Sequence, residues 1–182
     1  MTPEQIGVED VLTASGISSG SLYHHFGDLD SLIDTAMVVR FARGVDWSIE
    51  VLSEAMGQAR DRKDLAARLH HVTLQTQSPD RYDVRAERVR AIARATTSSR
   101  FREALAPEQS RLTIGVADVW SRLQKRGLVS PSIDPQAGSL FIQAYTLGLV
   151  LNDVSEDPIP FDAWVAVIDA VVSRILVDVV AE

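Results

Sequence analysis

Apolar residues recur at helical spacing along most of this sequence, and the pattern is clearest near its C-terminal end. Between residues 161 and 179, apolar side chains follow the i, i+3, i+4, i+7 rule, which predicts an amphipathic helix. The members of this stripe are Phe161, Trp164, Val165, Ile168, Val172, Ile175, Leu176 and Val179. No segment shows the alternation or the Asn-Gly and Asp-Gly turns of β-hairpins. The sequence therefore predicts an all-α protein.

The apolar surface of this C-terminal helix is wider than a single core requires. It is extended by Ala163, Ala166, Val167, Ala170 and Val171. We expect one face to pack on the protein's own core and the other on a second subunit. Residues 135–152 show the same spacing, and the prolines of SEDPIP then break the helix, so a helical hairpin is expected. The predicted dimer interface comprises Leu140, Ala144, Gly148, Trp164, Ile168, Val172 and Ile175.

Proline, glycine and capping residues divide the rest of the chain into further helices. Breaks are predicted at Ser78-Pro79, at Ala106-Pro107 and between Gly127 and Pro135. Asp28 and Asp61 stand where helix N-caps are expected. The helices predicted between these points cover residues 29–57, 62–77, 81–96, 107–126 and 135–152.

Composition excludes several classes of protein. The 182 residues contain no cysteine, which excludes disulfides, thiolate metal sites and cysteine nucleophiles. No apolar stretch reaches the length of about 18 residues that spans a bilayer, and the N-terminus lacks the pattern of a signal peptide. We therefore expect a cytoplasmic protein with no membrane partner. The net charge of −7 argues against indiscriminate binding to nucleic acid, but it allows a confined, specific contact.

Charge is unevenly distributed along the chain. Residues 1–39 contain six acids and no lysine or arginine, and the first base is Arg40. Residues 81–102 reverse the balance, with seven arginines against Asp83 and Glu87. Helical spacing places Arg81, Arg85 and Arg88 on one stripe. We expect this arginine-rich segment to be a solvated helix face with ion pairs along it.

The sequence contains no arrangement of residues typical of an active site. His70 and His71 are adjacent, so they point about 100° apart on a helix and cannot share a metal as an i, i+4 pair could. We expect one of them to line a cavity and the other to be solvated. Nucleotide-binding loops and hydrolase motifs are absent from the sequence. We therefore predict that the protein is not an enzyme and has no catalytic residue, cofactor or metal.

The first 32 residues have the pattern of a helix-turn-helix. Val8, Val11 and Leu12 form one short apolar face, Gly16 suits a tight turn, and Ser18 suits the N-cap of a second short helix. Two short helices joined in this way can place the second helix in the major groove of DNA. Its inward residues would be Leu22 and Phe26. Small or hydrogen-bonding side chains would face outward: Ser18, Ser19, Ser21, Tyr23 and His24.

The string GISSGSLYHHFGDLDSL closely resembles the DNA-binding signature of the TetR family of transcriptional regulators. The resemblance covers residues 8–32 and implies a homodimer that binds a palindromic operator in double-stranded DNA, usually as a repressor, until a small molecule binds. It implies a DNA-binding domain over residues 1–45 and an effector-binding and dimerisation domain over 46–182. Carried over by position, the DNA-contacting residues would be Ser18, Ser19, Gly20, Ser21, Tyr23, His24 and His25. His25 has a second interpretation, as a histidine packed beneath the helix.

The N-terminal region departs from the family pattern in two ways. Ser19 and Leu29 stand where the family commonly has lysine, and only seven residues precede Val8, where the family has a whole helix. We expect either that the chain is shortened at its start or that its DNA-binding region is impaired. The alternative function is a dimeric ligand-binding module with little affinity for DNA.

Effector-binding candidates come from the larger domain. Trp120, Phe141 and Tyr145 are large enough to line a cavity, and His71, Gln75 and Arg94 could supply polar anchors. Each could equally be ordinary core or surface. An effector cavity of a few hundred Å³ is expected, and the identity of the small molecule is unknown.

Overall fold

The computed structural model describes residues 5–177, and within that range every regular element is helical. The elements are α1 (Val8–Ser15), α2 (Ser19–Phe26), α3 (Leu29–Gly57), α4 (Arg62–Gln77), the 3₁₀ turn η2 (Pro79–Arg81), α5 (Tyr82–Thr97), α6 (Ser99–Lys125), α7 (Pro135–Gly148), α8 (Val150–Asp153) and α9 (Phe161–Val177). The predicted all-α fold is confirmed. None of the helices in this range is long and apolar enough to cross a membrane.

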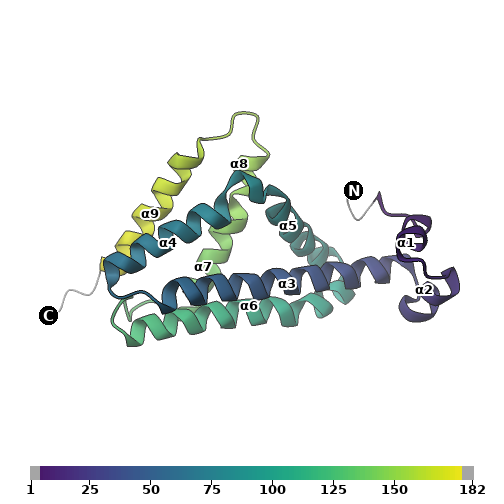
Figure 1. Cartoon of the computed structure of the whole chain (residues 1–182), viewed down its shortest axis with the longest axis horizontal. Helices are drawn as coiled ribbons and strands as arrows, with labels where there is room; N and C mark the ends of the chain where they lie inside the picture. The colour runs from purple at the N-terminus through teal and green to yellow at the C-terminus, as the bar shows by residue number, and fades with distance from the viewer. Residues whose placement is uncertain (1–4, 178–182) are drawn as a thin grey trace.

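The two longest helices, α3 and α6, lie side by side and form the base of the molecule (Figure 1). Their facing sides supply much of the core, including Phe41 and Val45 from α3 and Leu112 and Val116 from α6. The helices approach closely at Gly115, where an added Cβ would lie 2.5 Å from the Cδ1 atom of Ile49. Burial of these apolar side chains is the main force that holds α3 against α6.

The remaining large helices cover this pair, and the small α1 and α2 stand apart at one end of α3 (Figure 1). The domain boundary predicted at residue 45 falls inside α3, which runs unbroken from Leu29 to Gly57. The C-terminal segment was expected to form a hairpin with α7. Instead α9 packs mainly on α4, because its buried residues Val165, Ile168 and Leu176 belong to the protein's own core.

Two predicted helix boundaries are wrong. Pro107 was expected to mark a break, but it lies inside α6, which begins at Ser99. Ser98 caps that helix, since its hydroxyl accepts a hydrogen bond of 3.2 Å from the amide of Phe101. Pro107 is exposed, so water can hydrate the carbonyl that its missing N–H leaves without a partner. The helix predicted over residues 135–152 ends at Gly148, and α8 follows as a separate turn.

The arginine-rich segment is not simply a solvated face. Arg85 is only 2% exposed, because α7 and α8 cover this side of α5. Its guanidinium donates two hydrogen bonds of 2.8 Å to the carboxylate of Asp153 and one of 2.9 Å to the carbonyl of Ser78. This paired charge ties α8 and the end of α4 to α5.

We predict that Arg85→Met destabilises the protein by about 3 kcal/mol, because it leaves the mostly buried Asp153 carboxylate without its partner. Chemical denaturation monitored by circular dichroism measures this change. The control Arg102→Met removes an exposed arginine and should shift the free energy of unfolding by less than about 0.5 kcal/mol. Equal effects of the two substitutions would contradict the structural role of the Arg85 ion pair.

Candidate functional site

Helices α1 and α2 form a helix-turn-helix, as the sequence predicts. Gly16 ends α1 with a φ of 70°, a left-handed conformation that glycine adopts without strain. Its amide donates to the carbonyl of Leu12 at 2.9 Å. Two residues later Ser18 caps α2, with its Oγ accepting from the amide of Ser21 at 3.1 Å. The turn is therefore determined by local chemistry at each end.

The helix-turn-helix is attached to α3 through α2. Leu22 is completely buried, and Phe26 is half-buried. After α2, Gly27 takes a φ of 78° and Asp28 begins α3 by accepting a hydrogen bond of 2.6 Å from the amide of Ser31. Hydrogen bonds from Ser31, by side chain and backbone, hold the pKa of Asp28 below its ordinary value. The buried Leu22 and the capped corner at Asp28 thus join α2 to the start of α3.

The outward face of α2 presents most of the predicted DNA-contacting residues. Ser18, Ser19, Gly20, Tyr23, His24 and His25 are exposed, and Ser21 is half-buried. The imidazoles of His24 and His25 meet edge to face, with ring centroids 5.2 Å apart. His25 therefore lies on the surface, and the interpretation that placed it beneath the helix is wrong.

No cationic lysine or arginine lies on this surface. Arg40, the first base in the chain, forms an ion pair with Glu87. Arg94 and Arg100 both bind the carboxylate of Asp34, which is 7% exposed. These pairs join α3 to α5 and α6, and the two arginines at Asp34 share a single carboxylate, so one positive charge remains there. The donors on the outward face of α2 itself are hydroxyl, imidazole and backbone N–H groups.

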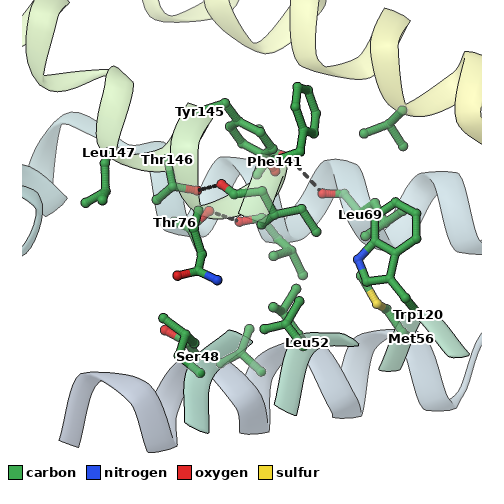
Figure 2. Close-up of a pocket in the computed structure, with 18 of the residues that line it drawn as sticks. Ser48, Leu52, Met56, Leu69, Thr76, Trp120, Phe141, Tyr145, Thr146 and Leu147 are labelled. Carbon is green, nitrogen blue, oxygen red and sulfur yellow. Dashed lines mark hydrogen bonds between the residues drawn. The ribbon is translucent and has the colours of Figure 1, made fainter. Parts of the chain in front are cut away.

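An apolar cavity lies between α3 and the helices above it (Figure 2). Its volume is about 110 Å³, smaller than the few hundred Å³ expected. Ser48, Leu52 and Met56 line it from α3, while Phe141 and Tyr145 face them from α7. An engineered apolar cavity of roughly 150 Å³ binds benzene. The cavity therefore has room for an apolar group of about that size.

Three of the six predicted effector residues line this cavity: Trp120, Phe141 and Tyr145. The other three lie elsewhere. Helix α4 turns Leu69, Val72, Thr73 and Thr76 toward the cavity, so the neighbouring positions face away. His71 and Gln75 are exposed, and the Nε2 atoms of their side chains lie 3.1 Å apart. Arg94 donates a hydrogen bond to the carboxylate of Asp34.

Neither of the adjacent histidines lines the cavity. His70 Nδ1 lies 2.7 Å from the carboxylate of Asp169 on α9, and its side chain is 46% exposed. The expectation that one histidine would face the cavity is therefore wrong, because both lie on the outer side of α4.

Sequence reasoning missed the basic part of the lining. Arg81, Arg85 and Arg88 all line the cavity. Helical spacing placed the three arginines on one stripe, but that stripe was expected to face solvent rather than a cavity.

Tyr145 is a half-buried tyrosine in the wall of the cavity. Burial raises the pKa of its phenol to about 12, and a hydrogen bond with the side chain of Thr73 opposes only part of this shift. The phenol therefore remains neutral over the whole physiological range. It can offer one hydrogen-bond donor to a ligand without adding charge to the cavity.

The predicted interface residues divide into two groups. Leu140 is 60% exposed, Ala144 is exposed, and Gly148 is half-buried on α7. On α9, Ile168 is 4% exposed, and Val172 and Ile175 pack on the core. The half-buried Trp164 is hydrogen-bonded through its indole to Gln77 at 3.4 Å. Ile168 is thus covered within the chain, while Val167, at 55% exposure, and Val171, at 36%, face outward.

No family model matches the sequence, and no curated protein matches it. Several solved structures, however, are similar to this chain. A protein of Mesorhizobium loti assigned to the TetR family of transcriptional regulators aligns with 95% of this chain and 86% of its own, at a TM-score of 0.72 and 16% identity. A Rhodococcus protein assigned to the same family aligns with 96% of this chain and 89% of its own, at a TM-score of 0.69 and 22% identity.

A third similar structure is the TetR-family regulator PfmR of Thermus thermophilus, which covers 94% of this chain and 90% of its own at a TM-score of 0.59 and 16% identity. The chain therefore has the fold of TetR-family transcriptional regulators, as the N-terminal signature predicts.

Tyr145 provides a pH test of the cavity. We predict that its phenol ionises only near pH 12 in the folded protein, against an ordinary tyrosine pKa of 10.0. Below pH 10 the phenol is neutral in both the folded and the unfolded state, so it makes stability no more dependent on pH there. Above that value the unfolded state loses the proton more readily, and stability falls as pH rises. Difference ultraviolet spectra between the wild type and Tyr145→Phe isolate this phenol. Ionisation near pH 10 would show that water reaches the phenol and would contradict its burial.

Proposed function

We propose that this protein is a ligand-responsive transcriptional regulator that binds operator DNA as a homodimer, most simply as a cytoplasmic repressor. One observation carries the proposal: the exposed polar face of α2 stands at the free end of α3, on a fold shared with TetR-family regulators. Residues up to the first part of α3 would bind DNA. The remaining helices would bind the effector and the second subunit.

The chemistry of α2 suits a helix that enters the major groove. Ser19 and Gly20 have little bulk, so the backbone of the helix can approach DNA closely. Tyr23, which is 49% exposed, and His24 offer donors and acceptors to phosphates and base edges. The absence of lysine and arginine means that specific hydrogen bonds, rather than charge, must provide most of the affinity.

Dimerisation would use the apolar residues that α7 and α9 leave exposed. Leu140, Val167 and Val171 lie on these helices and are 36 to 60% exposed. We expect the two-fold axis of the dimer to place two copies of α2 on the same side. Their separation should then match one DNA turn, about 34 to 36 Å.

Helix α3 would couple the effector to DNA. Its later part lines the cavity through Ser48, Leu52 and Met56, and its first residues carry α2. The ion pairs of Asp34 with Arg94 and Arg100 fix the start of α3 to α5 and α6. A ligand that shifts α3 relative to these helices would therefore change the position of α2.

One observation favours the second candidate, a dimeric effector-binding module with little DNA affinity. The described part of the helix-turn-helix has acids at Glu9, Asp10 and Asp28 and no lysine or arginine. Such a surface repels phosphates at long range. Binding of DNA is thus the property that separates the two candidates.

Fluorescence anisotropy with the DNA upstream of the protein's own gene tests DNA binding. We predict that the wild type binds a specific DNA fragment at low salt. Tyr23→Ala and His24→Ala should each bind it about tenfold or more weakly, since each removes a groove contact. The control Tyr82→Ala removes a tyrosine of similar exposure, 44%, from α5 and should bind like the wild type. No binding at low salt would favour the effector-binding module, and unchanged binding by Tyr23→Ala would contradict the role of α2.

Sedimentation of the purified chain tests the interface. We predict a dimer that Leu140→Glu or Val171→Glu converts to folded monomer, because a charge would be buried against the second subunit. The control Val39→Glu places the same charge on an exposed valine of α3, 45% exposed, and should leave the dimer intact. A stable monomer of the unmodified chain would contradict the proposed interface.

A further inference from the structure

The cavity contains two arginine side chains whose charges the described residues do not neutralise. Arg81 stacks over the ring of Trp47, with its guanidinium carbon 4.5 Å from the ring centroid, and Arg88 lies 5.5 Å from that of Phe41. Neither guanidinium has a hydrogen bond or ion pair within residues 5–177, whereas Arg85 between them is fully engaged by Asp153. Burial lowers the pKa of Arg88. Arg88 therefore loses solvation without gaining a counter-charge.

A second donor without a partner lies elsewhere in the same cavity. Trp120 is 6% exposed, and its indole Nε1 has no hydrogen-bond partner in the described structure. Figure 2 shows the nitrogen on the side of the ring that faces the cavity. A buried N–H without an acceptor is unfavourable, because it has lost its hydrogen bond to water. Such groups are rare in native proteins unless a ligand or water satisfies them.

The two sets of donors lie beside different positions along α3. Arg81 is held against Trp47, beside Ser48, and in Figure 2 Trp120 lies at the Met56 end of α3. Nine residues separate positions 47 and 56, which corresponds to about 13 Å along a helix. Leu52, Phe141 and other apolar side chains line the space between. The cavity thus has a cationic end, an apolar middle and a neutral donor at the far end.

We propose that the effector is a small organic carboxylate, with its anionic group at Arg88 and Arg81, an apolar body in the middle, and a hydrogen-bond acceptor at Trp120 Nε1. This inference rests on the proposed ligand-responsive function and specifies the class of ligand. A carboxylate would supply the missing counter-charge through charge-assisted hydrogen bonds. A hydrocarbon would leave all three donors unsatisfied, and a cation would meet two like charges.

Isothermal titration calorimetry of the purified chain, without DNA, tests the charge requirement. Benzoate and octanoate are compared with benzamide and octanamide, which have nearly the same shape but no charge. We expect each carboxylate to bind about 10- to 100-fold more tightly than its amide, as hydrogen bonds to charged groups allow. Equal affinities, or no binding by any of the four at millimolar concentrations, would overturn the proposal.

Substitutions locate the anion-binding end. Arg88→Met keeps the apolar stem and should abolish the preference for carboxylate over amide, while Arg88→Lys should retain most of it. Arg90→Met removes an arginine from the same helix that does not line the cavity, so it serves as the matched control. A preference that survives in the double variant Arg81→Met and Arg88→Met would overturn the assignment.

The far end is tested with para-acetylbenzoate, which adds a carbonyl acceptor opposite the carboxylate. We expect it to bind more tightly than benzoate in the wild type and to lose this advantage in Trp120→Phe, which should still prefer carboxylate to amide. An advantage that persists in Trp120→Phe would exclude Trp120 as the donor. These measurements involve no DNA, so their failure would leave the operator-binding result unaffected, and the reverse also holds.

Discussion

The packing of α3 along α6 determines where every other part of the molecule can be. Phe41 and Val45 on one helix and Leu112 and Val116 on the other are buried in one continuous core, and the glycine at position 115 allows the backbones to approach closely. One end of α3 holds the helix-turn-helix, and the other forms a wall of the cavity. The two candidate sites are therefore joined by one continuous helix.

The sequence predicted most helices because local signals define them. Ser18, Asp28 and Asp61 cap the helices that they were expected to cap, and these bonds involve residues three apart. Pro107 misled the prediction because its effect on a helix depends on exposure. Whether a proline breaks a helix is decided by the surroundings, which no local pattern contains.

Side-chain partners could not be predicted in the same way. The interpretation of the arginine stripe as a solvated face failed because Asp153, the partner of Arg85, lies 68 residues away. His71 and Gln75 were chosen for their chemistry, yet α4 turns them outward. Trp120, Phe141 and Tyr145 were found because large apolar residues at helical spacing usually face the interior, and here that interior contains a cavity.

The unbroken length of α3 has a mechanical consequence. About 23 residues separate Leu52 at the cavity from Leu29 beside α2, a lever of roughly 35 Å at the helical rise per residue. Tilting such a lever by about 5° at the cavity would displace its far end by about 3 Å. Two subunits that tilted in opposite senses would double the change. Sub-ångström adjustments around a small ligand would thus be amplified into a mismatch with the fixed pitch of DNA.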